Sequence, residues 1–211
     1  CEVVVDHIGR DLVRVPVSPT LENWYGGGGV VAHCGGSSTR LSADSVAWYP
    51  LTRRFDMVGS VRIRDTAFTL DSRTATYFIA DERLEAYTEV VAANRRSGSV
   101  LRGPNLTYLR AAQGIRDTTE MRATGRPTIE YRAEADSTVE PYIIVADRVR
   151  LRGNDQVWGG GAVTIDRSDF AARGDSFALD QGSGRGHLVG ARRPTVTGKG
   201  ARPYTLEGTR I

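Results

Sequence analysis

The two cysteines are the first residues of this sequence that could carry chemistry. Cys1 and Cys34 are its only cysteines. A cysteine at the first position of a mature chain is where a bacterial lipoprotein carries its lipid, which predicts lipidation of Cys1 and a membrane tether. A disulfide between Cys1 and Cys34, formed in an oxidising compartment, is the alternative, and an arbitrary start of the sequence is a third. Lipidation favours a periplasmic protein held at a membrane.

The three histidines give no sign of a metal site. His7, His33 and His187 stand far apart, and the sequence contains no Cys-x-x-Cys pair, so we expect no metal. His33 directly precedes Cys34, but neighbouring residues on a strand point to opposite faces. The two are therefore poor candidates for a Cys-His nucleophile pair, and we interpret both as structural.

Motifs for catalysis or nucleotide binding are missing or incomplete. The glycine-rich stretch "GGGGVVAHCGGSST" lacks the lysine that a phosphate-binding loop requires. The sequence contains neither Gly-x-Ser-x-Gly nor Ser-x-x-Lys, and its carboxylates show no paired arrangement. "RGD" at residues 173–175 falls inside an expected strand and is interpreted as coincidence. We expect no catalytic residue, no cofactor and a protein that is not an enzyme.

The charge of the chain is mildly basic and well mixed. Lys and Arg number 28 against 25 Asp and Glu, and Lys199 is the only lysine. The arginines alternate with acidic residues instead of forming a block, so we expect no nucleic-acid partner. Two doublets, Arg53-Arg54 and Arg95-Arg96, fall at expected loop tips. If the tips share one rim, they form a basic edge for lipid phosphates or an acidic partner; solvated turn charges are the alternative.

A repeat organises the chain. "GSVRIRDTAF" (residues 59–68) and "GAVTIDRSDF" (residues 161–170) share the pattern Gly-x-Val-x-Ile-x-x-x-x-Phe. Each copy is preceded at nearly the same offset by a related stretch, "SADSV" (residues 42–46) and "VADRV" (residues 145–149). Two matches at one spacing indicate an internal duplication.

Segments in which polar and apolar residues alternate follow one another along the chain. This period of two is typical of half-buried strands, and the short polar clusters between them are typical of hairpin turns. The segments are residues 28–34, 43–49, 57–64, 71–78, 86–94, 102–109, 123–131, 146–152, 159–166, 173–180 and 189–198. Only residues 111–120 and 133–140 leave room for a helical turn or a loose loop. The sequence predicts an all-β chain of repeated hairpins.

A hairpin cannot bury its apolar face alone, so successive hairpins must stack and share one elongated apolar interior. The glycines before Val30, Val61 and Val163 are typical of bends at which a sheet folds over on itself. We expect an elongated antiparallel fold of stacked hairpins whose interior is both a core and a potential trough for lipid.

The series Ala-Asp-x-Val, Gly-x-Val-x-Ile and Phe-x-Leu-x-Ser resembles the repeat of the OstA/LptA family of periplasmic lipopolysaccharide-transport proteins. The stretches "LSADSVAWY" and "VGSVRIRDTAFTLDSRTATYF" carry the resemblance, which covers roughly residues 26–211. The resemblance implies a β-jellyroll or β-taco fold, in which two facing sheets hold acyl chains and unpaired edges bind neighbours. Residues 1–25 would then form an N-terminal tether or extended segment, and residues 26–211 a single domain.

If the resemblance holds, strand parity places six apolar residues in the interior: Val61, Ile63, Phe68, Val163, Ile165 and Phe170. The leading hypothesis is a non-enzymatic periplasmic protein that binds or passes an amphipathic glycolipid through this interior. The alternative is a lipid-anchored structural subunit that braces a large membrane assembly, such as a respiratory, photosynthetic or translocation complex. The first hypothesis requires a lipid ligand and the second a protein partner.

Overall fold

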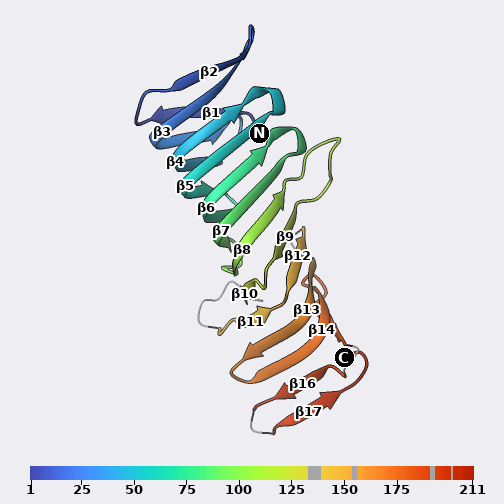
Figure 1. Ribbon diagram of the computed structural model, residues 1–211. Helices are drawn as coiled ribbons and strands as arrows, with labels where there is room; N and C mark the ends of the chain where they lie inside the picture. The colour runs from blue at the N-terminus through green and yellow to red at the C-terminus, as the bar shows by residue number, and fades with distance from the viewer. Residues whose placement is uncertain (133–138, 154–155, 191–192, 201) are drawn as a thin grey trace.

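The described part of the chain consists almost entirely of antiparallel strands stacked into one elongated body (Figure 1). Figure 1 is a computed structural model, and it describes residues 1–132, 139–153, 156–190, 193–200 and 202–211. The strands are β1 (Val3–Ile8), β2 (Val13–Ser18), β3 (Leu21–Cys34), β4 (Arg40–Tyr49), β5 (Arg54–Arg64), β6 (Phe68–Phe78), β7 (Arg83–Asn94), β8 (Val100–Leu109), β9 (Glu120–Thr124), β10 (Thr128–Tyr131), β11 (Tyr142–Val145), β12 (Arg148–Arg152), β13 (Gln156–Arg167), β14 (Phe170–Asp180), β15 (Arg185–Val189), β16 (Thr195–Gly198) and β17 (Tyr204–Glu207), with the short 3-10 turns η1 (Pro50–Thr52) and η2 (Ile79–Asp81). The predicted fold class, an elongated all-β fold of stacked antiparallel hairpins, is confirmed.

Most of the long strands change register near the middle, and the sheet folds double at these points. The shifts in β3, β5, β7 and β13 fall between Gly27 and Val30, between Val58 and Val61, between Tyr87 and Val90, and between Gly160 and Val163. In a straight strand Phe68 and Tyr77 would lie about 30 Å apart. The Phe68 ring instead lies 4.6 Å from the ring of Tyr108, which is two strands across from Tyr77 through Leu84. The two halves of each long strand therefore face one another.

The fold thus has two layers joined along a line of bends, which we call the spine. Layer I contains β2, β9, β12, β15 and the halves of the long strands that pair with them; layer II contains β1, β10, β11, β16, β17 and the other halves. The turns at the free ends of the layers form two rims. The layer I rim includes residues 50–53, 79–82 and 110–119, and the layer II rim includes residues 35–39, 65–67 and 95–99.

The repeated sequence motifs build the spine. Gly59 and Gly161 have left-handed φ angles of 74° and 80°, a conformation that glycine adopts without strain. A Cβ atom at either position would overlap the carboxylate of Asp44 or Asp147. The Ala-Asp-x-Val motif therefore supplies the aspartate that covers the glycine of the Gly-x-Val-x-Ile motif. The two motifs are the two strands of one bend.

The core lies between the layers and is continuous along the stack. The valines that follow the bends, Val30, Val61, Val90 and Val163, are at most 2% exposed. They pack in or beside a cluster that draws from both layers and includes Met57, Leu70, Leu106, Ala123, Ile129, Ile144, Val157 and Phe177. The shared apolar interior expected from stacked hairpins is thus present.

The first 25 residues pair with the rest of the sheet. β1 lies along the end of β3, from the pair Val3 and Cys34 to the pair Ile8 and Val30. β2 lies along the beginning of β3, from Val13 opposite Tyr25 to Ser18 opposite Leu21. The expected boundary between residues 25 and 26 falls inside β3.

The predicted strand segment 123–131 is present but divided in two. Residues 111–119 form turns, as the sequence predicts, and are followed by β9 and β10, which are separated by Gly125, Arg126 and Pro127. This tripeptide lies at the spine, so β9 and β10 correspond to one bent strand. Most of the second expected loop, residues 133–138, lies outside the described residues. Among the residues that are described, no helix has the length and apolar character needed to cross a membrane.

Candidate functional site

A cavity of about 900 Å³ lies between the two layers, from β6 to β13. Its inner wall is apolar. Layer II supplies Phe68, Ala92, Leu101, Ile129, Tyr131 and Ile144, and layer I supplies Tyr108, Met121, Leu151 and Val157. The cavity is therefore a widening of the interior that forms the core elsewhere.

Strand register brings the lining residues together. In layer I, Tyr108 lies opposite Met121 and Met121 lies opposite Leu151. In layer II, Ile129 is flanked by Leu101 and Ile144. Directly opposed residues in a sheet point to the same face, so each layer presents a continuous apolar row to the cavity.

The rim of the cavity is polar. Layer II contributes Asn94, Arg96, Ser97 and Ser99, and layer I contributes Asp117, Thr118, Thr119, Gln156 and Gln181. The Asn94 side-chain oxygen accepts hydrogen bonds from the backbone N–H groups of Arg96, at 2.9 Å, and Ser97, at 3.0 Å. Arg96 and Asp117 are the charged side chains among the described lining residues. A ligand with an apolar body and a polar end fits this arrangement.

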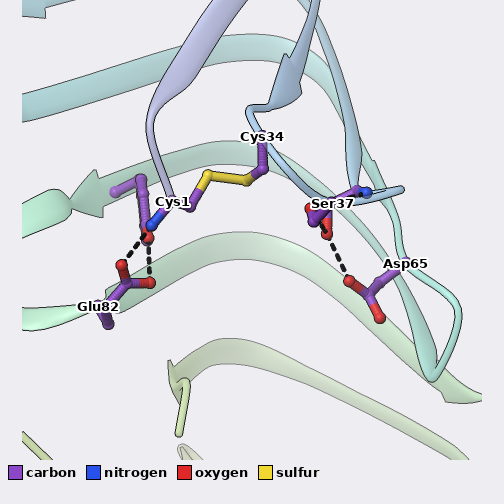
Figure 2. Close-up of a disulfide and its surroundings, with 7 residues drawn as sticks. Cys1, Cys34, Ser37, Asp65 and Glu82 are labelled. Atoms are coloured by element: carbon purple, nitrogen blue, oxygen red, sulfur yellow. Dashed lines mark hydrogen bonds and ion pairs between the residues drawn. A yellow bond between two sulfur atoms is a disulfide. The ribbon is translucent and has the colours of Figure 1, made fainter. Parts of the chain in front are cut away.

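The same interior is closed toward the N-terminus. There Cys1 is joined by a disulfide to Cys34, on the layer II rim, with a Cα–Cα distance of 5.1 Å. The amino group of Cys1 forms an ion pair with Glu82, on the layer I rim. Figure 2 shows Cys1 between Cys34 and Glu82, so this one residue connects the two rims.

Buried polar groups complete the closure. The Tyr77 hydroxyl donates a hydrogen bond to Glu82. Burial, together with that hydrogen bond, raises the pKa of Tyr77 far above its ordinary value. Burial alone would raise the pKa of Glu82, but hydrogen bonds from the Cys1 amino group and Tyr77 lower it below the ordinary value. Glu82 is therefore held ionised between two donors.

Asp65 holds a second polar contact on the layer II rim. Its carboxylate accepts hydrogen bonds from the Thr39 hydroxyl and, at 3.0 Å, from the Ala67 N–H. Burial acts to raise the pKa of Asp65, but these hydrogen bonds and the positive charge of Arg110, which belongs to the layer I rim, lower it. Figure 2 shows Asp65 near Ser37, in the turn that follows Cys34. The hydrogen bond between Thr39 and Asp65 thereby joins the turn that follows Cys34 to the turn that precedes Phe68.

Phe68 and Tyr108 stand where the closed part meets the cavity. Their ring centroids are 4.6 Å apart and the ring planes are tilted by 42°, a favourable contact for aromatic rings. Both residues line the cavity, and Phe68 is also a buried member of the core cluster. The pair forms a partition between the packed core and the cavity.

The six expected interior residues occupy two environments. Val61, Ile63, Phe68 and Val163 are buried in the core, whereas Ile165 and Phe170 are partly buried and pack against it. Of the six, only Phe68 lines the cavity. The other cavity residues come mainly from β8 to β12. Ile129 and Tyr131 lie in the predicted strand segment 123–131 and Leu151 in the segment 146–152, whereas Ile144 lies in the apolar run of residues 142–145, which was not predicted as a strand.

The arginine doublets lie on opposite rims. Arg53 and Arg54 begin β5 at the layer I rim, where the Arg54 guanidinium stacks 4.3 Å from the ring centroid of Tyr49. Arg95 and Arg96 lie at the layer II rim, and Arg96 lines the cavity. The doublets therefore lie on opposite rims and do not form a single basic edge.

Cys1 takes the disulfide alternative in this structure. A sulfur atom in a disulfide has no valence left for a thioether-linked lipid, so lipidation of Cys1 requires a chain in which this bond is absent. His33 lies next to Cys34 but hydrogen-bonds Asp6, with its Nδ1 atom 2.8 Å from Oδ1. Among the described residues, no group of three or more His, Cys, Asp and Glu side chains is placed to hold a metal ion.

The sequence matches no known protein-family model and no characterised protein. The resemblance to the OstA/LptA repeat therefore depends on the short motifs, which in this structure form the bends of the spine.

Proposed function

We propose that this protein is a non-enzymatic lipid-binding protein that holds an amphipathic glycolipid between its two layers. The acyl chains would lie in the cavity from Phe68 to Val157, and the polar head would lie at the rim beside Arg96. The resemblance to lipopolysaccharide-transport proteins supports a ligand of lipopolysaccharide type and a periplasmic location.

The cavity carries this proposal. A volume of about 900 Å³ is at the upper end of the roughly 300–1,000 Å³ typical of ligand pockets. Burial of one methylene group contributes about 0.8 kcal/mol, so about a dozen buried methylenes contribute about 10 kcal/mol before the cost of association. An apolar wall with a polar rim provides this gain without burying the head of the lipid.

A fluorescent fatty acid provides the test. The delipidated protein should bind the probe, and purified lipopolysaccharide should displace it. Leu151 is a partly buried cavity residue, and Leu151→Trp should fill the cavity and weaken binding of the probe at least tenfold. Val58→Trp, on the exposed outer face of β5, adds the same side chain outside the cavity and should bind as the wild type does. Equal binding by both variants would contradict the proposal.

A structural role in a membrane assembly is the second candidate, and the ends of the stack favour it. β2 is exposed along its whole length, with Val13, Val15 and Val17 each at least 44% exposed. At the other end, Tyr204 and Leu206 of β17 are 52% and 51% exposed. Unpaired apolar edge strands are typical sites for strand addition by a partner.

Crosslinking in native membranes distinguishes the two candidates. A photoreactive residue in place of Val15 or Leu206 should crosslink to one membrane-complex subunit if the structural role holds. A protein that binds lipid and yields no crosslink at either end would exclude the structural role.

A further inference from the structure

A second, smaller hollow of about 280 Å³ lies on the outside of the molecule, beside the bend of β13. It is lined by Arg126, Ala162, Val163, Thr164, Arg173, Gly174, Asp175, Arg193 and Thr195. Thr164, Arg173 and Thr195 lie directly opposite one another on β13, β14 and β16. Their neighbours Ile165, Ala172 and Val196 pack in or against the core, so this row of residues points away from the lipid cavity.

The lining is rich in hydrogen-bond donors. Arg126, Arg173 and Arg193 each carry a guanidinium group with five N–H donors, and Thr164 and Thr195 add hydroxyl groups. The Arg126 guanidinium already donates to Asp147, at 3.0 Å. The lining thus contains three guanidinium groups and one carboxylate, that of Asp175, and this excess of positive charge favours an anionic ligand.

Some arginines of the sheet form ion pairs with neighbouring carboxylates, but two arginines of the hollow form none with a described residue. Arg102 pairs with Glu130, and Arg167 pairs with Asp169 at 2.6 Å. Within the part of the chain that the structure describes, no carboxylate lies within ion-pair distance of Arg173 or Arg193. The hollow therefore contains positive charge that no described carboxylate pairs with directly.

Two residues in left-handed conformations shape the backbone around the hollow. Ala162 is at the bend of β13 with a left-handed φ of 43°, and Arg126 has a φ of 63° between Gly125 and the buried Pro127. The Arg126 N–H also donates to the Asp147 carbonyl, at 3.3 Å. A backbone that already has the shape required for binding reduces the conformational entropy that the protein loses when a ligand binds.

We propose that this hollow binds a phosphate or sulfate group. The planar fork of a guanidinium matches two oxygens of such an anion, and three forks with two hydroxyls can surround a tetrahedral one. The volume admits a phosphate monoester but not the acyl chains of a lipid. Asp175 also lines the hollow and has an interaction of its own; its negative charge weakens binding of the anion.

Calorimetric titration with inorganic phosphate at low ionic strength tests the site. The wild type should show saturable binding. The affinity of the double variant Arg173→Gln with Arg193→Gln for phosphate should be lower by a factor of roughly ten or more. Arg173→Lys keeps the charge but loses the fork, so its affinity should fall between the two. Asp175→Asn should strengthen binding several-fold because it removes a repelling charge.

Two controls make the titration decisive. Arg62→Gln removes an exposed arginine from the outer face of β5, away from the hollow, and should bind phosphate as the wild type does. Leu151→Trp, which fills the lipid cavity, should also leave phosphate binding unchanged, so this site and the lipid cavity can fail independently. Phosphate binding that is absent, or equal in the wild type and the double variant, would overturn the free-phosphate form of the proposal.

A vesicle arm identifies the source of the anion. Vesicles of phosphatidylcholine with and without phosphatidic acid present the same group on a membrane. Binding to phosphatidic acid that requires Arg173 and Arg193, without binding of inorganic phosphate, assigns the hollow to a lipid headgroup. Binding of inorganic phosphate alone assigns it to a soluble ligand, and no arginine-dependent binding in either arm rejects the site.

Discussion

The N-terminal and middle parts of the stack are built from the same bent hairpins but treat their interior differently. From β3 to β7 the two layers pack on each other, and Cys1 links the layer II rim to the layer I rim through Cys34 and Glu82. Beyond the contact between Phe68 and Tyr108, a cavity that extends to β13 lies between the layers beside the core. The comparison shows that the same repeated unit can enclose either a closely packed core or a cavity, and that the rims are linked through Cys1 in the closely packed part.

The largest expected effect comes from removal of the disulfide. The bond closes a loop of 33 residues, so Cys34→Ala should destabilise the protein by about 3–4 kcal/mol in urea unfolding. The closed part should also open: hydrogen exchange should increase in β3 and β4 and change little in β13 and β14. Uniform exchange along the whole stack would show that the disulfide does not act on one part alone.

Truncation of a leucine in each part measures the difference in packing. Leu70 of β6 is 0% exposed in the closed part, and Leu70→Ala should cost about 3 kcal/mol in the free energy of unfolding. Leu151 faces the cavity and is only partly buried, so Leu151→Ala should cost about 1 kcal/mol. Equal costs by chemical denaturation would mean that the cavity is packed as tightly as the core.

The bends at the spine are common to both parts. One substitution at a bend should increase the stability of the protein, by no more than the preceding substitutions decrease it. Thr88 and Glu89 in β7 have left-handed φ angles of 63° and 55°. At the position of Thr88, the corresponding bends of β5 and β13 have a glycine, Gly59 or Gly161. Thr88→Gly should therefore stabilise the protein by about 1 kcal/mol. Gly59→Ala, at the equivalent bend, should destabilise it because the added Cβ meets Asp44. Thermal melting of both variants tests the equivalence of the bends.

The smallest effect concerns the pH dependence of the closure. The folded pKa of Glu82 is lowered, so its contribution is present above the unfolded pKa of about 4.3 and is lost as pH falls through the folded value. The contribution should be about 1 kcal/mol or less. Glu82→Gln should flatten the acid limb of the stability curve, measured by urea unfolding from pH 7 to pH 3. A curve of unchanged slope would contradict a structural role for the ionised Glu82.

Much of the fold could be predicted because its signals are local. Alternation of polar and apolar residues identified most of the strands, and the glycines before Val61 and Val163 identified the bends. The strands β1, β2, β11 and β17 were not predicted; β11, for example, is a run of four apolar residues in which polar and apolar residues do not alternate. The cavity was missed for another reason: Ile129 and Leu151 lie in predicted strands, but strand alternation does not show where the two layers pack and where a space remains between them.

The arginine doublets show a different limit. Their position at turns follows from sequence, but turns of a folded-over sheet can lie on either rim, and only the folded chain shows that Arg53 and Arg95 lie on opposite rims. The sequence did not distinguish lipidation of Cys1 from a disulfide with Cys34 for a related reason. A disulfide requires that the two cysteines lie close together, and only the folded chain shows that they do.

The sequence by itself determined that this chain forms bent, stacked hairpins, because strand alternation, turn residues and the Asp-Gly pairs at the spine act over short distances along the chain. The tertiary structure alone decided where the layers close and where they leave a cavity. The contacts of the closed part join residues far apart in the chain: Cys34 and Glu82 are 33 and 81 residues from Cys1, and Phe68 contacts Tyr108. No local pattern encodes such distances, because they arise only when the sheet folds over and its two rims meet.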